Sequence, residues 1–288
     1  MRVLDSHLHL WDPSRLDYPW LEGPLAARFA GAELAETDTA GAAVFVQAEC
    51  LEAQFLDEVR WVAESAPATG VVGIVAGARL DRGAETEAHL VALAELALAS
   101  GARIVGVRHL LQGEPDGTAT SEAFLAGAAS VAARGWAFDA CVRPPQLPDV
   151  TALAAALPEL RIVLDHLGKP AVGTAPVPLV PDAAWIRDIG DLAVHGNVAV
   201  KLSGLPAEAG GSWDATQVAP FLDVVADAFG PDRLLWGSDW PVSAVGPEGY
   251  RAGDRTAWLD AVAGWAEDRG LDVDAVLWRN AARVYGLA

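Results

Sequence analysis

The chain opens with the stretch Val3-Leu-Asp-Ser-His-Leu-His-Leu-Trp11, an apolar run that leads directly into two histidines and a tryptophan. A doubly wound open sheet would carry a glycine-rich phosphate-binding turn after an early strand, and this stretch has none. Seven more runs follow, and they are continuously apolar, as is typical of parallel strands covered on both faces. The eight runs span residues 3–8, 43–48, 71–76, 104–110, 137–142, 162–167, 198–202 and 234–238.

Segments with the apolar spacing of helices alternate with these runs. They span residues 55–66, 85–99, 122–134, 150–157, 185–194, 218–229 and 256–269, and a final one spans 274–285. Such units within 288 residues match the size of a (β/α)8 TIM barrel. Residues 11–39 are rich in proline, glycine and aromatics, so we expect a long first βα loop over the barrel mouth. We therefore predict an α/β fold, a single TIM-barrel domain over residues 1–288 with an extra C-terminal helix.

The composition excludes several classes of protein. The 39 acidic and 20 basic side chains give a formal charge of −19, which repels phosphate backbones and anionic lipids, so we expect no nucleic-acid or membrane partner. The two cysteines, Cys50 and Cys141, are too few for a disulfide framework or a structural zinc motif. No apolar run reaches the ~18 residues of a membrane span, and the first residues do not resemble an export signal. We expect a cytoplasmic protein.

Polar residues gather where the predicted strands end, which is where a barrel carries its chemistry. His7 and His9 lie two apart on one strand, so both face the same side and could chelate one divalent cation. For such a pair in isolation, two hydrogen-bonded histidines would be the favoured interpretation. Two further histidines, His109 and His166, also lie at predicted strand ends, together with Asp239. This convergence favours a functional site.

Asp239 follows the buried apolar run Leu234-Leu-Trp236 and precedes Trp240-Pro241. A carboxylate in such a place must be paired, bound to a metal or protonated, because burying it bare is costly. Helix capping is the structural alternative. No helical pattern follows immediately, which weakens that alternative.

Four motifs resemble the amidohydrolase superfamily of metal-dependent hydrolases, and within it the branch of sugar-acid lactonases. They are Asp5-Ser-His-Leu-His9, Leu164-Asp-His-Leu-Gly-Lys-Pro170, Leu235-Trp-Gly-Ser-Asp-Trp-Pro241 and Asn280-Ala-Ala-Arg-Val-Tyr-Gly286, and the branch also rests on Gly106-Val-Arg-His-Leu-Leu-Gln112. The resemblance implies one divalent metal ion, expected to be zinc. Its implied ligands are His7, His9, Asp239 and His166, with Glu49 as a further oxygen ligand. The chain departs from the two-metal pattern at Arg108-His109 and at Cys141-Val-Arg143.

The function that this resemblance implies is metal-dependent hydrolysis of an aldonic or uronic type of lactone to its hydroxy acid. The metal would activate water, and Asp239 would take the proton and return it to the leaving alkoxide. Arg108 or His109 would stabilise the oxyanion. His166 would contact either the metal or the substrate carbonyl, and the sequence leaves both open.

Several residues are expected to bind the small-molecule lactone. Aromatic rings pack on sugars while amides bind hydroxyls, and the candidates are Trp11, Trp20, Trp240, Gln47 and Gln112. Arg143 and Lys169 would attract a carboxylate, with a structural salt bridge as the alternative for each. Lys201 lies on an interior strand, so we expect a buried ion pair with Asp165 or Asp5. Together these cations predict a positive pocket inside a negative shell.

Two other functions remain open from the sequence. The first is metal-dependent decarboxylation of a small aromatic or dicarboxylic acid, since decarboxylases of this superfamily share the same ligand set. The second is a non-catalytic barrel that binds a sugar acid, although pure binding does not require the general base Asp239. A monomer or a homodimer is expected.

Overall fold

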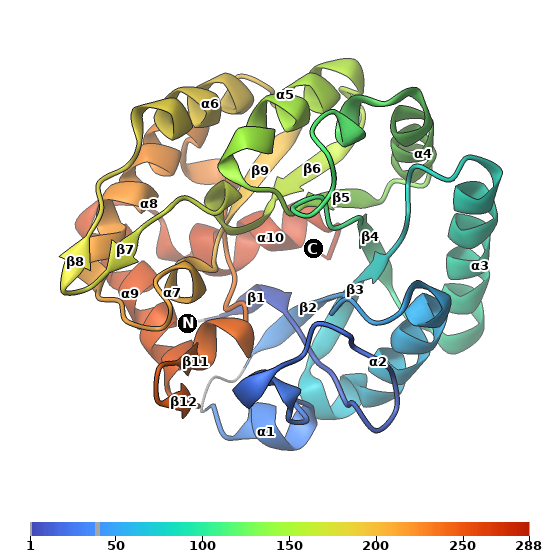
Figure 1. The fold of residues 1–288 in the computed structure, drawn as a ribbon, viewed down its shortest axis with the longest axis horizontal. Helices are drawn as coiled ribbons and strands as arrows, with labels where there is room; N and C mark the ends of the chain where they lie inside the picture. The colour runs from blue at the N-terminus through green and yellow to red at the C-terminus, as the bar shows by residue number, and fades with distance from the viewer. Residues whose placement is uncertain (1, 38–40, 288) are drawn as a thin grey trace.

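The computed structural model describes residues 2–37 and 41–287, and its centre is a sheet of eight parallel strands (Figure 1). Their order in the sheet is their order in the chain: β1 (Leu4–Leu8), β2 (Ala42–Val46), β3 (Val71–Gly77), β4 (Ile104–Arg108), β5 (Ala137–Ala140), β6 (Arg161–Leu164), β9 (Val198–Leu202) and β10 (Leu234–Trp236). A parallel bridge between Leu8 and Trp240 joins β1 to the segment after β10. This nearly closed barrel confirms the predicted fold class.

Helices surround the strands, as Figure 1 shows. They are α1 (Gly31–Ala35), α2 (Phe55–Thr69), α3 (Ala84–Ser100), α4 (Glu122–Ala133), α5 (Leu147–Ala156), α6 (Ala183–Ala193), α7 (Leu205–Glu208), α8 (Ala215–Phe229), α9 (Asp254–Asp268) and α10 (Asn280–Val284). Local chemistry sets their ends. The Asp214 side chain accepts a hydrogen bond from the backbone amide of Gln217 at the start of α8. Gly70 ends α2 with a φ of 71°.

In the described part of the connection from β1 to β2, the helical elements are a short 3-10 turn at Gly23–Ala26 and the five-residue helix α1, in agreement with the predicted long loop. Trp11 holds this loop together. Its indole N–H donates to the carbonyls of Leu25 and Ala27, at 3.1 and 2.9 Å, and its backbone pairs with Phe29. Residues 1, 38–40 and 288 of the predicted domain, of which 38 and 39 belong to the predicted loop, lie outside the described residues.

The interior of the barrel is apolar at the end where the strands begin. Leu4, Val44, Val75 and Leu235 pack there with Tyr285, which follows α10, so the C-terminal helix covers the end where the strands begin. The final predicted helix is divided, because a wider π-type turn over Ala275–Arg279 precedes α10. Because this end is apolar and covered, the polar side chains that follow the strands meet at the opposite end of the barrel, where the strands finish.

Five strands end two or three residues earlier than predicted: β2 at Val46, β4 at Arg108, β5 at Ala140, β6 at Leu164 and β10 at Trp236. After β6, His166 and Leu167 have φ values of 53° and 56°, which a strand ladder cannot accommodate. Two small hairpins, β7 (Gly173–Thr174) with β8 (Val177–Pro178) and β11 (Val245–Gly246) with β12 (Gly249–Tyr250), were not predicted. Among the described residues, no helix is both long and apolar enough to cross a membrane.

Candidate active site

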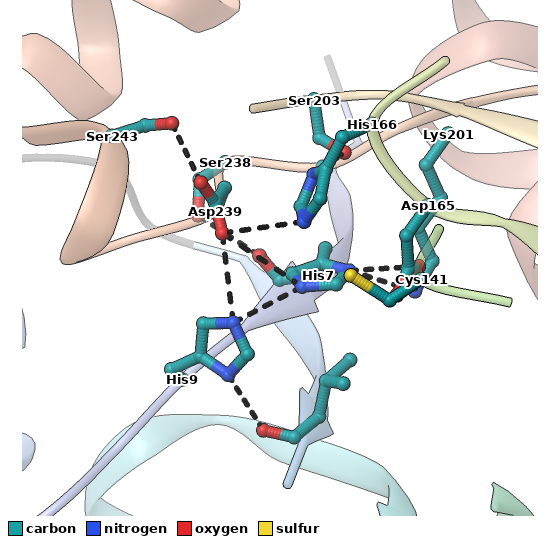
Figure 2. A network of polar contacts seen from close by, with 12 residues as sticks. His7, His9, Cys141, Asp165, His166, Lys201, Ser203, Ser238, Asp239 and Ser243 are labelled. Carbon is teal, nitrogen blue, oxygen red and sulfur yellow. Dashed lines mark hydrogen bonds and ion pairs between the residues drawn. The ribbon is translucent and has the colours of Figure 1, made fainter. Parts of the chain in front are cut away.

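Three imidazoles approach one carboxylate oxygen at the carboxyl end of the barrel (Figure 2). The Nε2 atoms of His7, His9 and His166 lie 3.8, 3.5 and 3.7 Å from Oδ1 of Asp239. The His7 and His9 Nε2 atoms are 3.1 Å apart. All four side chains are buried. The structure thus brings together four of the residues that the sequence singled out.

Irregular backbone aims these side chains at one another. The pairing of β1 with β2 shifts register between Asp5 and Leu8, so the Asp5 carboxylate meets Arg255 of the outer helix α9, while His7 faces the barrel interior. His166 and Asp239 follow their strands with φ values of 53° and 54°. A positive φ is uncommon for residues other than glycine and often marks a functional site.

Each member of the cluster is held by a partner on its outer side. The Nδ1 atom of His9 lies 2.8 Å from the Val46 carbonyl, and that of His166 lies 2.9 Å from the Ser203 hydroxyl. The Ser243 hydroxyl donates to Oδ2 of Asp239 at 2.8 Å. Such outer contacts fix ring orientation and tautomer. They leave the Nε2 atoms and Oδ1 turned toward the centre.

Burial and charge keep this cluster in the protonation states that metal binding requires. Burial lowers the pKa of His7 and of His166 well below the usual value, which keeps both imidazoles neutral. Burial alone would raise the pKa of Asp239, but His166 and His9 lower it below its usual value. Neutral imidazoles and an ionised carboxylate are the ligands that zinc takes in proteins. The ligand atoms of His7, His9 and Asp239 all lie within 4.8 Å of one another, so the site fits a divalent ion.

A cavity of about 520 Å³ opens above the cluster. His9, His166 and Asp239 lie on its inner wall. Five other residues proposed from the sequence also line it, namely Trp20, Glu49, Arg108, Gln112 and Lys169. This volume suits a small ligand such as a sugar lactone.

The cavity is not the positive pocket that the sequence predicted. Four carboxylates and two cations line it: Glu49, Glu52, Glu208, Asp239, Arg108 and Lys169. Both cations are already engaged. Arg108 donates to the Gln47 carbonyl at 2.6 Å and lies 3.5 Å from Asp165, and Lys169 donates to Oε1 of Gln112 at 2.7 Å. The prediction was wrong because it counted cations at strand ends without the acidic loops.

His109 points away from the cavity. Its Nδ1 accepts the Leu80 amide at 3.3 Å and its ring packs on Phe124 of α4. Since successive residues of an extended chain face opposite sides, Arg108 facing inward sends His109 outward. Its predicted catalytic role has no geometric support.

Two of the predicted sugar-binding tryptophans are structural. Trp11 and Trp240 are fully buried and pack on either side of Phe29, and neither lines the cavity. The Trp240 indole donates to the Tyr250 hydroxyl at 3.0 Å. Trp20 does line the cavity, is 38% exposed, and donates to the Ala48 carbonyl at 2.7 Å.

Three other candidates lie differently from the prediction. Gln47 is buried behind the wall, where its amide donates to the Glu49 carboxylate. Glu49 therefore has a protein partner and is in neither group of potential metal ligands among the described residues. Arg143 is exposed and does not line the cavity.

A second polar cluster lies deeper, below the histidines. The fully buried Nζ of Lys201 lies 2.5 Å from Oδ2 of Asp139 and 3.0 Å from Oδ1 of Asp165. The Tyr285 hydroxyl donates to Asp139 at 2.9 Å. The predicted Lys201–Asp165 pair is thus present, whereas Asp5 pairs with Arg255 instead.

Sequence reasoning missed several neighbours of the site. Glu208 ends the four-residue helix α7 after β9, and Ser243 lies in a three-residue 3-10 turn after β10; both elements are too short to show a periodic pattern that would place a side chain. Asp139 lies inside an apolar run and Tyr285 at the end of the chain. Their only sequence signal is polarity within a predicted interior element, together with an interior lysine that requires counter-charges.

Comparison with known proteins gives consistent results. Residues 4–287 match the family model described as amidohydrolase. The chain is 35% identical to an L-fucono-1,5-lactonase of Burkholderia ambifaria, over 98% of this chain and 92% of the relative. The same identity holds for an L-fucono-1,5-lactonase of Burkholderia multivorans, over 99% and 96%. A solved amidohydrolase structure from Burkholderia multivorans with bound zinc is 31% identical, with a TM-score of 0.78 over 99% of both chains. By sequence and by fold, this chain belongs to the amidohydrolase family.

Proposed function

We propose that this protein hydrolyses a sugar-acid lactone, with one zinc ion held by His7, His9 and Asp239. The observation that carries the proposal is the approach of three imidazoles to Oδ1 of Asp239 at the inner wall of the cavity. The lactonase relatives and the zinc-containing neighbour support it. When bound, a divalent cation supplies Lewis acidity, which polarises a carbonyl and lowers the pKa of water.

Asp239 is the residue suited to move the proton. Its lowered pKa keeps it ionised at neutral pH, so it can accept a proton from the water that attacks the lactone carbonyl carbon. When the bond between that carbon and the ring oxygen breaks, the same proton passes to the ring oxygen. The Ser243 hydroxyl fixes the orientation of the carboxylate during both transfers.

Arg108 and His166 are suited to contact the carbonyl oxygen of the lactone. Arg108 is a buried cation on the cavity wall, and its Nε has no hydrogen-bond partner among the residues that the structure describes, so it can donate to the developing oxyanion. His166 is not in the ligand group of His7, His9 and Asp239. We therefore place its Nε2 beside the substrate carbonyl.

The outer cavity provides contacts for a polyol ring. The Trp20 ring offers an apolar face, and the linked side chains of Gln112 and Lys169 offer a carbonyl and an ammonium to hydroxyl groups. Glu208 lies 4.0 Å from Lys169 and adds an acceptor. These residues would orient the ring with its carbonyl toward Asp239.

The proposal is tested with a pH-indicator assay on aldonic and uronic lactones, beginning with L-fucono-1,5-lactone, in parallel with CO₂ release from aromatic carboxylates. We expect acid release from at least one lactone. His166→Asn should lower kcat by about 100-fold, whereas His109→Asn should retain activity per folded molecule. CO₂ release without lactone hydrolysis would overturn the proposal in favour of a decarboxylase.

Location and assembly remain predictions. The two cysteines are free and buried, which agrees with a cytoplasmic enzyme. The predicted monomer or homodimer is distinguished by light scattering after gel filtration, and the predicted absence of nucleic-acid binding by a mobility-shift assay.

A further inference from the structure

Two groups of side chains among the described residues could hold a metal ion, and they share His7. The first comprises His7, His9 and Asp239, and the second comprises His7, Asp165 and His166. Both groups are buried. His7 presents Nδ1 to Asp165 and Nε2 to His9, so on ligand chemistry alone the barrel could hold two ions with the His7 ring, as an imidazolate, bridging them.

The second group already contacts a cation that belongs to the chain. Nζ of Lys201 lies 3.0 Å from Oδ1 of Asp165 and 2.9 Å from Nδ1 of His7. A third contact, to Asp139 at 2.5 Å, matches the three donors of an ammonium group. Figure 2 shows Lys201 and Asp165 together on the side of His7 that faces away from His9.

This ammonium cannot easily move aside. Lys201 is fully buried, as are Asp139 and Asp165, and removing the cation would leave two carboxylates uncompensated in the barrel interior. A divalent ion bound by Asp165 and His7 would also stand next to a positive charge. The lysine thus acts on the second group as a competing cation.

The first group has neutral partners on its open side. His9 contacts the Val46 carbonyl, and Asp239 accepts the Ser243 hydroxyl. No lysine or arginine contact to His9 or Asp239 occurs within the described residues. The Lys201 ammonium contacts His7 of this group through Nδ1, whereas Nε2 faces His9. An exchangeable cation is therefore favoured on the Nε2 side of His7.

We propose that Lys201 occupies the second cation site of the barrel and thereby limits the protein to one divalent ion per chain. This inference rests on the proposed metal site but not on the identity of the substrate. Lys201 acts here as a positioning residue, because it holds Asp165 against His7 and touches no reacting group.

The test is metal stoichiometry, measured on the full chain after chelator treatment, saturation with Zn²⁺ and gel filtration, with zinc counted by mass spectrometry. We expect one ion per chain in the wild type and two in Lys201→Met. The chain offers a matched control, since Lys169 is its only other lysine. Lys169→Met, altered at the cavity wall, should remain at one ion.

A folding defect in Lys201→Met does not remove the test. The double variant Lys201→Met with Asp139→Asn removes one buried carboxylate together with the ammonium, and it leaves His7, Asp165 and His166 intact. It should also bind two ions. Two ions in the wild type, or one ion in folded Lys201 variants, would overturn the inference. Lack of lactonase activity with unchanged stoichiometries would refute the proposed function instead.

Discussion

The two polar clusters of the barrel share His7 but differ in the source of their positive charge. The lower cluster contains its own cation, since Lys201 lies between Asp139 and Asp165. The upper cluster, around Asp239, consists of three imidazoles and a carboxylate, with a cavity above it. The difference separates a structural role from a chemical one. A permanent ion network stabilises the barrel interior, and the face next to the cavity is left for an exchangeable ion and substrate.

The largest effect should come from the upper cluster. Asp239→Asn keeps the size of the side chain but removes its proton-accepting ability and weakens metal binding, so kcat/KM should fall about 10³-fold. The initial rate of acid release from a lactone measures this. The exposed Asp260→Asn on α9 is the control and should show wild-type rates. A loss of less than tenfold at position 239 would exclude Asp239 as the general base.

The lower cluster should respond in stability instead. Lys201→Met leaves Asp139 and Asp165 buried without their cation, which should lower the free energy of unfolding by about 3 kcal/mol. Lys169→Met should lose less than about 1 kcal/mol, because Lys169 lies at the cavity wall. Urea unfolding monitored by tryptophan fluorescence gives both values. Equal losses in the two variants would contradict a special role for the lower network.

The sequence identified the residues of the upper cluster because strand ends of a barrel meet at one end, whatever the details of the loops. His7, His9, His166 and Asp239 all came from that rule. It failed for His109, Trp11 and Trp240, since it predicts the end of the barrel but not the direction of a side chain. That direction depends on the register shift in β1 and on strands that end early.

The cavity wall should show a smaller effect, on binding. Trp20→Ala removes the aromatic face from the cavity and should raise KM about tenfold with little change in kcat. Trp278→Ala is the matched control, since that ring stacks with Arg2 before β1, at the opposite end of the barrel. Steady-state kinetics on the same lactone distinguish the two. An unchanged KM in Trp20→Ala would remove Trp20 from the substrate site.

The smallest effect concerns Glu58, a buried carboxyl group that forms no ion pair among the described residues, in contrast to Asp165. Burial raises the pKa of Glu58 to about 8, although the hydrogen bond that its carboxylate accepts from the Ala48 backbone amide acts to lower that pKa. The folded protein therefore binds this proton more tightly than the unfolded chain, so Glu58 should reduce stability progressively as pH rises from about 4.5 to about 8. Glu58→Gln should gain about 1 kcal/mol at pH 6 relative to pH 5. The exposed Glu64→Gln on the same helix should gain nothing, and equal pH profiles for both variants in urea unfolding would contradict the raised pKa.

Titration of metal-free protein with Zn²⁺, with lactone hydrolysis as the readout, tests the central claim most directly. The account predicts negligible acid release without metal, a linear rise with added zinc, and a break at one equivalent per chain. Full activity in the metal-free protein, or a break at two equivalents, would contradict it.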